Sequence, residues 1–303
     1  MRRLIVVSVI SLLSYAAAAQ SERYEQRYDL LVSKLGPAGV GVETVLDNWE
    51  KADSTNPKML VARFEYLFTK SQTTQVVTKQ SGKYLGMEPL LTVKDSTGND
   101  VHYYQEAFYD DELYGQAVQA VDKAISIHPS RLEFRFVKAN AYIAYEKESP
   151  DMAIAYLKEL INEFRTSKED WTYNGEKIDE EFFPDSMLEY CFSFYSIGSP
   201  AAMDAFLNLS QQMSALYPDN PAFVNNVGTY HFVAKQDFKT ALKFYNKVLK
   251  SHPDDYTAIK NCILVAKKQN NLKLEKKYLQ MMVKYGPEKE QMTAKARLSH
   301  IEK

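Results

Sequence analysis

The chain has 303 residues, of which 45% are apolar, 25% charged and 13% aromatic. With only 11 glycines and 11 prolines, this composition excludes a collagen-like chain and an intrinsically disordered one. The formal net charge is only −2, and two cysteines, Cys191 and Cys262, are too few and too far apart for a disulfide framework or a zinc site.

The first element of the chain is an N-terminal export signal. Arg2 and Arg3 precede a mostly apolar run over residues 4–13, and small residues follow, with Ala17 and Ala19 in an A-x-A arrangement. These features are typical of a secretory signal peptide. The run is too short to span ~30 Å of hydrocarbon. We therefore expect residues 1–19 to be removed, leaving an exported, soluble chain in the periplasm or outside the cell, without a transmembrane segment.

Apolar residues recur with helical spacing along most of the remaining chain and predict paired helices. We expect pairs near residues 21–35 with 40–53, 58–72 with 109–127, 131–147 with 150–165, 184–197 with 200–217, 220–234 with 237–251, and 254–268 with 271–285. A last, polar helix within residues 288–303 is expected to cap the array.

Two insertions, at about residues 73–108 and 166–183, interrupt the helical pattern. In the first, Gln75–Lys79 and Leu90–Val93 are short β-prone runs, and the second of them leads through a turn-forming segment into residues 101–104, which predicts a hairpin with a long turn. In the second, Asn174-Gly175 predicts a two-residue type I′ turn, since both central residues need positive φ. These insertions either bind a ligand or only cover an edge of the helical array.

A repeat organises the helical part of the chain. Ala117 and Ala241 begin similar amphipathic segments, and each is followed twelve positions later by a proline, Pro129 or Pro253. Prolines recur at intervals of 35 and 34 residues, at Pro218, Pro253 and Pro287. A fixed period near 34 residues predicts a helical array.

These residues resemble the tetratricopeptide repeat (TPR) family, most clearly between Pro221 and Pro253. Val227-Gly228 is similar to the family's Leu-Gly pair, and Ala241 to the small residue of its second helix. Small residues let two antiparallel helices approach closely, and the terminal proline ends the second helix. The resemblance implies an all-α fold, a right-handed α-solenoid of TPR-like helix pairs over residues 20–287, with two small β-hairpin insertions.

Three short triplets are candidate modification sites: Asp53-Ser54-Thr55, Asp95-Ser96-Thr97 and Asp185-Ser186-Met187. They resemble the O-glycosylation acceptors of exported Bacteroidetes proteins, so we expect their serines to be O-glycosylated. Chance occurrence of so short a motif is the alternative. The chain as a whole resembles an exported bacterial, Bacteroidetes-like member of the TPR family.

No motif supports catalysis, a metal or a cofactor. The sequence contains no H-E-x-x-H, no G-x-S-x-G and no glycine-rich phosphate loop, and its five histidines are scattered. Cys191 lies in a largely apolar helical segment, which favours a buried thiol over a nucleophile. The acidic run Asp179–Glu181 is typical of a solvated loop. We therefore interpret the chain as a non-enzyme.

The family resemblance implies a concave groove lined by the first helix of each pair, which usually holds an extended peptide. Asparagine can both donate to and accept from a peptide backbone, and lysine can meet a terminal carboxylate. The two-carboxylate clamp of the family's chaperone-binding members is not present in register. The candidate groove residues are Arg135, Lys138, Asn140, Asn226, Tyr230, Lys260 and Asn261.

We therefore expect a non-enzymatic scaffold that binds a protein or peptide in the cell envelope, and no nucleic-acid partner. The alternative is a carbohydrate-binding or enzyme-accessory protein that uses the insertions. In that case Tyr103, Trp171 and Tyr173 would stack on sugars.

The C-terminal part of the chain is basic, with 16 basic and 7 acidic residues in 235–303, against 19 and 32 in 20–234. Within it, four lysines follow a helical spacing that places them on one stripe: Lys239, Lys243, Lys247 and Lys250. We expect this stripe to face outward on the convex surface, with Lys273, Lys276 and Lys277 continuing it. Its partner is an acidic protein, a phosphate-bearing envelope surface or another copy; the alternative is a role in solubility alone.

Overall fold

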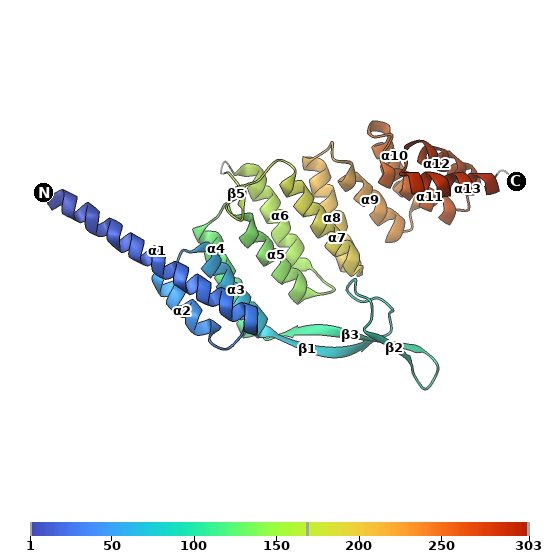
Figure 1. Cartoon of the computed structure of the whole chain (residues 1–303). Coiled ribbons are helices and arrows are strands. Elements are labelled where there is room, and N and C mark those ends of the chain that lie inside the picture. Colours follow the sequence, from blue (N-terminus) through green and yellow to red (C-terminus); the bar gives the residue numbers. More distant parts are fainter. Residues whose placement is uncertain (1, 168–169, 302–303) are drawn as a thin grey trace. The chain divides into compact units, whose positions relative to one another are not determined.

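The structure is a computed structural model that describes residues 2–167 and 170–301 (Figure 1). The chain forms two compact units. Unit 1 comprises Met1–Tyr145 and Asn162–Ile178, and unit 2 comprises Glu146–Ile161 and Asp179–Lys303. Within the described residues, no helix combines the length and apolar character needed to cross a membrane.

Unit 1 is built from helices and an inserted sheet. Its helices pack in sequence around a core that contains Trp49, Phe64 and Phe134. Contacts join α1 to α2, α2 to α3, and α3 to α4. The helices are α1 (Arg2–Leu35), α2 (Val42–Ala52), α3 (Pro57–Ser71), α4 (Asp111–Ile127) and α5 (Leu132–Glu146), and the boundary with unit 2 lies within α6 (Asp151–Thr166).

Helix α1 is longer than predicted, because it runs from Arg2 through the expected cleavage point. Its described core contacts come from later residues, with Tyr28 buried and Tyr24 packed beside it. The buried Ser21 hydroxyl accepts a hydrogen bond from the Trp49 indole at 2.8 Å. Ser21, Tyr24 and Tyr28, which cleavage after Ala19 would retain, therefore pack α1 on its neighbours.

Unit 2 contains three further helix pairs and a final helix. Helices pack within the pairs α7–α8, α9–α10 and α11–α12, and α13 packs on α12. The bounds are α7 (Phe182–Ile197), α8 (Pro200–Leu216), α9 (Pro221–Val233), α10 (Phe238–Ser251), α11 (Tyr256–Lys268), α12 (Leu272–Tyr285) and α13 (Glu288–Ile301). The predicted fold class, paired helices with small antiparallel sheets inserted, is confirmed.

The repeat is visible in the backbone angles at the ends of three second helices. His128, Tyr217 and His252 follow α4, α8 and α10 with φ/ψ of −128°/69°, −122°/69° and −127°/75°. Each of them precedes a proline, which disfavours helical angles in the residue before it. The same local chemistry therefore ends the second helix in both units.

Close helix contact in the α9–α10 pair depends on small residues. Ala241 is fully buried, and a Cβ atom added to Gly228 would lie 2.6 Å from Cε1 of Tyr245. In the next pair a glutamate, Glu275, occupies the small position. Its buried carboxylate accepts two hydrogen bonds from the Arg297 guanidinium of α13, at 2.8 and 3.0 Å. An arginine from the last helix thus compensates for the larger acidic side chain.

The first insertion contains the predicted hairpin, and its other β-prone run, Gln75–Lys79, forms a further strand that pairs with the hairpin. β1 (Gln72–Lys79), β2 (Leu91–Lys94) and β3 (Asp100–Tyr109) form an antiparallel sheet in the order β1-β3-β2. β1 continues directly from α3, and β3 leads into α4. The Asp110 amide donates to the Ser71 carbonyl at 2.8 Å, which joins the two ends. We call residues 72–109 the arm, which extends away from α3 and α4 (Figure 1).

The second insertion matches its prediction. β4 (Thr172–Tyr173) pairs with β5 (Glu176–Lys177) across the turn. Asn174 and Gly175 have φ of 51° and 83°, so both central residues are in the positive region that a type I′ turn requires. The insertion is anchored in unit 1, because Trp171 is buried with its ring 5.5 Å from that of Phe164.

Candidate functional site

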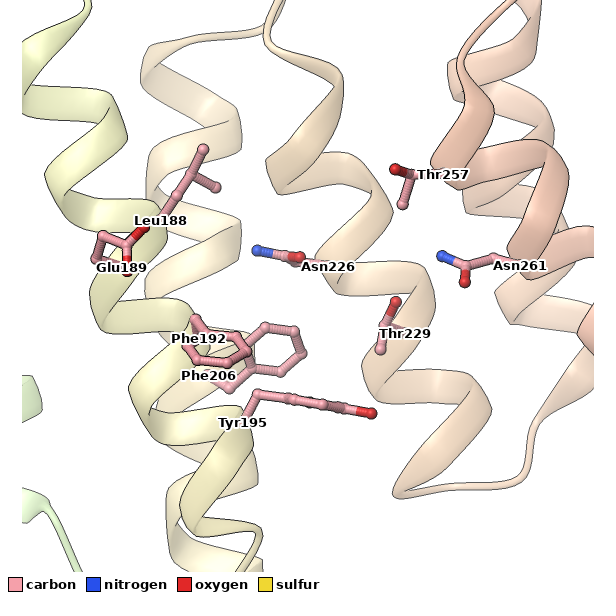
Figure 2. Close-up of a pocket in the computed structure, with 9 residues that line it drawn as sticks. All are labelled: Leu188, Glu189, Phe192, Tyr195, Phe206, Asn226, Thr229, Thr257 and Asn261. Atoms are coloured by element: carbon pink, nitrogen blue, oxygen red, sulfur yellow. The ribbon is translucent and has the colours of Figure 1, made fainter. Parts of the chain in front are cut away.

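The groove of unit 2 is the best-formed candidate site. A cavity of about 590 Å³ opens between the first helices α7, α9 and α11 (Figure 2). Its lining residues come from four helices: Leu188, Glu189, Phe192 and Tyr195 from α7, Phe206 from α8, Asn226 and Thr229 from α9, and Thr257 and Asn261 from α11.

One side of the groove is aromatic. Phe192 and Tyr195 are 65% and 39% exposed, although they are large apolar side chains. The Tyr195 ring lies 5.6 Å from that of Phe206, and the three rings cluster on the α7 side (Figure 2). Exposed aromatic rings that sit together in a concavity provide apolar area that a ligand can bury.

The other side of the groove presents amide groups. Asn226 and Asn261 are 35 residues apart, so they occupy equivalent positions on α9 and α11. Both side chains point into the space between the helices (Figure 2). Neighbouring contacts fix the two helices: Asn225 donates to Asp255 Oδ1 at 3.2 Å, and the same oxygen caps α11 by accepting from the Ala258 amide. These hydrogen bonds join the two helices that carry Asn226 and Asn261.

The remaining candidates in unit 2 lie elsewhere. The Tyr230 ring is buried, and its hydroxyl donates a hydrogen bond to Asp204 of α8 at 2.6 Å. Tyr230 therefore joins α9 to α8 and does not line the groove. Lys260 is exposed with its ammonium 5.6 Å from the centre of the Tyr256 ring, and it does not line the cavity.

The candidates of α5 belong to unit 1. Arg135 is buried and bonded to Glu163 at 2.6 Å, while Lys138 pairs with Asp122 at 2.6 Å. Asn140 is exposed on the same helix. The two cations thus have structural partners within their own unit.

Sequence reasoning missed the aromatic side of the groove. Phe192 precedes Asn226 by 34 residues, which is the repeat period, so the periodicity could have identified it. The same reasoning missed Tyr195, one helical turn further along α7. A sequence pattern alone does not separate apolar residues in a core from those in a groove.

An acidic region adjoins the aromatic side. Glu189 lines both the groove and a neighbouring hollow of about 330 Å³, which Glu181 and Asp185 also line. No ion pair is recorded for these three carboxylates among the described residues. The end of the groove nearest Glu189 therefore carries negative charge.

The two cysteines are buried, free thiols, which agrees with the prediction that they stay unpaired. Burial raises the pKa of both Cys191 and Cys262 to about 12, so each thiol is protonated at neutral pH. Protonated, inaccessible thiols are poor nucleophiles. In the described part of the chain, no group of three His, Cys, Asp or Glu side chains is arranged to hold a metal ion.

The basic stripe lies on the outer side of α10. Its four lysines are exposed, whereas the buried residues of α10 are Ala241, Tyr245, Val248 and Leu249. The helix contains no acidic residue, and none of the four lysines has an ion pair recorded within residues 170–301. On α12, Lys273 and Lys277 are exposed as well, and Lys277 lies 4.8 Å from the Tyr278 ring centre. The stripe is Lys239, Lys243, Lys247 and Lys250.

Trp171, Tyr173 and Tyr103, the proposed sugar-stacking residues, do not present equivalent open rings. Trp171 is only 7% exposed. Tyr173 is 36% exposed with its ring 6.2 Å from that of Phe136, and Tyr103 is half-buried in the arm.

Comparisons with known proteins give structural similarity alone. No family model matches the chain, and no curated protein matches it. Among solved structures, it is similar to MamA (residues 41 to the end) of Desulfovibrio magneticus RS-1, with 13% identity and a TM-score of 0.36 over 78% of this chain and 97% of that one. PilW, a widely conserved type IV pilus biogenesis factor, has 11% identity and a TM-score of 0.38 over 90% and 97% of the two chains. For pilF of Pseudomonas aeruginosa these values are 10%, 0.38, 93% and 99%. Shared architecture does not carry function with it.

Proposed function

We propose that the protein is a non-enzymatic scaffold that binds an extended segment of a partner protein in the groove of unit 2. The observation that carries this proposal is the juxtaposition of exposed Phe192 and Tyr195 with Asn226 and Asn261 across one cavity. Aromatic anchors supply most of the binding energy in many interfaces. The amides supply donors and acceptors for a peptide main chain.

The charge at one end of the groove favours a particular peptide. An extended chain rises about 3.3 Å per residue and points successive side chains to opposite sides. An apolar side chain on the aromatic cluster would therefore leave a nearby position facing Glu189. We expect that position to prefer lysine or arginine, and the preference to weaken with salt because the site is open to solvent.

Selection from a random peptide library on the purified chain, followed by calorimetry, tests this function. We expect the selected peptides to combine an apolar residue with a basic one, and to lose about 10-fold or more in affinity in Phe192→Ala and in Asn226→Ala/Asn261→Ala. Met292→Ala is the matched control, because Met292 is 66% exposed on α13, away from the groove. Selected peptides that bind Phe192→Ala as tightly as the wild type would contradict the proposal.

The proposed location of this scaffold is the cell envelope, after removal of residues 1–19. The support is the sequence of the signal segment. Intact-mass measurement of the protein from its host should give a chain that begins at Gln20. A chain that retains Met1 or Arg2 in the exported fraction would contradict processing at this point.

A second candidate function rests on the basic stripe, which we propose to contact an anionic lipid surface of the envelope. Protein interfaces usually need apolar anchors at their centre, and none of the large apolar residues with high exposure lies on α10. A diffuse anionic layer needs only charge, at about 1 kcal/mol per lysine.

Vesicle sedimentation tests the lipid contact. Vesicles that contain phosphatidylglycerol should retain the chain, and Lys239→Gln/Lys243→Gln/Lys247→Gln should weaken retention about 10-fold or more. The charge-matched control replaces three exposed lysines of unit 1, Lys34, Lys51 and Lys83, with glutamine. Equal losses in the two triple variants would indicate an effect of net charge alone, and unchanged retention would leave the stripe as a solubility device.

A further inference from the structure

The arm has two faces of opposite character. In the β1–β3 pair, Val76 lies opposite Gln105 and Thr78 opposite Tyr103, and Leu91 of β2 also lies opposite Tyr103. Directly opposed residues share a face of the sheet. We call this side the uncharged face; it comprises alternate residues of β1 from Gln72 to Thr78, of β2 from Leu91 to Val93, and of β3 from Val101 to Tyr109, and none is charged.

All the charged residues of the three strands lie on the opposite face. There Lys79 is 3.6 Å from Glu106, and Lys94 is 3.2 Å from Asp100. The loop of residues 80–90 also folds over this side. Tyr84 packs edge-on against the buried Tyr104 ring at 5.6 Å, and the Tyr104 hydroxyl donates to the Ser81 carbonyl at 2.8 Å.

Among the described residues of unit 1, none forms an equivalent cover over the outer part of the uncharged face. Val76, Leu91 and Val93 retain 65%, 56% and 37% of their surface exposed. Only the base is packed, where the Tyr109 ring lies 5.7 Å from that of Tyr114. Small isolated sheets are marginally stable when an apolar face stays in water. A partner that covers the face would therefore stabilise the arm.

We propose that a second copy of the chain covers this face, so that two arms pack face to face as a small sandwich. In a two-fold interface each residue meets the same patch of the partner. A charged face would then oppose like charges, whereas a face of valine, leucine, threonine and glutamine does not. Stacked sheets about 10 Å apart interdigitate side chains of this size.

The same chemistry disfavours other occupants. An acidic or basic partner finds no charge to pair with on the uncharged face. A bilayer surface is usually met by lysine or arginine flanking the apolar residues, but Lys79 and Lys94 of the arm lie on the opposite side in ion pairs. A second uncharged sheet face fits both features.

The size of the face sets the strength of the association. Three strands about 4.8 Å apart, with about six residues each rising by about 3.3 Å, present only a few hundred Å². Stable interfaces bury about 800 Å² per partner. The dimer is therefore weak and reversible.

Sedimentation equilibrium of the full chain up to about 1 mM tests the proposal. Val76→Lys should raise the dissociation constant at least 10-fold, because it places two like charges in the interface. Gln75→Lys is the matched control, since Gln75 is the exposed neighbour on the opposite face, and it should associate like the wild type. Equal melting temperatures would show that both variants are folded.

Cross-linking gives an independent readout. Thr78→Cys places a thiol on the uncharged face, and Thr73→Cys places one on the other face of the same strand; the native cysteines are buried. Under mild oxidation at high concentration, only Thr78→Cys should form a disulfide-linked dimer. A wild type that stays monomeric up to about 1 mM, or identical behaviour of Val76→Lys and Gln75→Lys, would overturn the proposal.

Discussion

The helix pairs α3–α4 and α9–α10 share one packing scheme but differ in the segment that joins their helices. In both, the second helix buries an alanine completely, Ala117 or Ala241, and ends at a histidine that precedes a proline. A short link joins α9 to α10, whereas the whole arm joins α3 to α4. The comparison teaches that the small residue and the helix ends define the pair, and that the link can vary.

A long segment such as the arm can replace a short link at small cost in free energy, because the two ends of the link already lie together. The Asp110 amide bonds the Ser71 carbonyl at 2.8 Å, so the arm leaves and re-enters the pair at one point. The entropy cost of closing a loop rises only slowly with length. Most arm residues are exposed, so the arm is added to the pair rather than built into its core.

The largest expected effect is the same in both pairs. Ala117→Leu and Ala241→Leu should each destabilise the helix pair by about 3 kcal/mol, because a fully buried contact has no room for the added carbons. Denaturant unfolding of the two variants measures the loss. A wild-type midpoint in either variant would contradict the shared packing scheme.

The next largest loss of stability should occur in the pair α9–α10 and not in the pair α3–α4. Gly228→Ala should cost about 2 kcal/mol, since the new Cβ would lie 2.6 Å from the buried Tyr245 ring. Gly115→Ala on α4 is the matched control, because no atom lies within 4 Å of its added Cβ. We expect the control to be neutral or to stabilise by up to about 1 kcal/mol, because alanine favours a helix. Parallel losses in the two melting temperatures would count against the close contact at Gly228.

Alkaline pH should act on the unit that holds α9–α10, because both buried thiols belong to unit 2. The pKa of each is raised to about 12 in the folded chain, above the value of about 8.5 for an exposed thiol. The contribution of the protonated thiols to the stability of the fold is therefore fully present below pH 8.5 and is lost as the pH rises toward 12. Between pH 9 and 10 each thiol should cost about 1 kcal/mol of stability. The slope of unfolding free energy against pH should be shallower in Cys191→Ala/Cys262→Ala, and an unchanged slope would assign it to other groups.

The smallest effect concerns the arm itself. Replacing residues 75–106 with Asn-Gly would join Thr74 to Ala107, which are opposed in the β1–β3 register, by a two-residue turn. The stability of α3–α4 should change by less than about 1 kcal/mol, while self-association should disappear. Loss of the unit 1 unfolding transition in this variant would show that the arm is part of the pair.

Features encoded by neighbouring residues could be predicted from the sequence. The expected second helix at 237–251 is observed at Phe238–Ser251, with the Asp237 side chain capping it through the Thr240 amide. The Asn174-Gly175 turn was predictable for the same reason, because positive φ at two consecutive residues is a local demand. Helix caps, turns and a repeat period are short-range properties.

Part of the candidate site was also predictable, because Asn226 and Asn261 recur at one repeat position and line one groove. The fate of Tyr230 was not, because its burial depends on Asp204 in another helix. The sequence pattern does not distinguish Phe192 and Tyr195 from core residues. Their exposure in a concavity results from the packing of α7 beside α9.

The paired helices, their ends, the repeat and the small hairpin follow from the sequence, since each depends on residues within a few turns of one another. The pairing of β1 with β3 and the pairing of Glu275 with Arg297 emerge only in the folded chain. Each of these joins residues that lie far apart in the chain. Apolar period and turn chemistry do not state which distant partner a strand or a buried charge will meet.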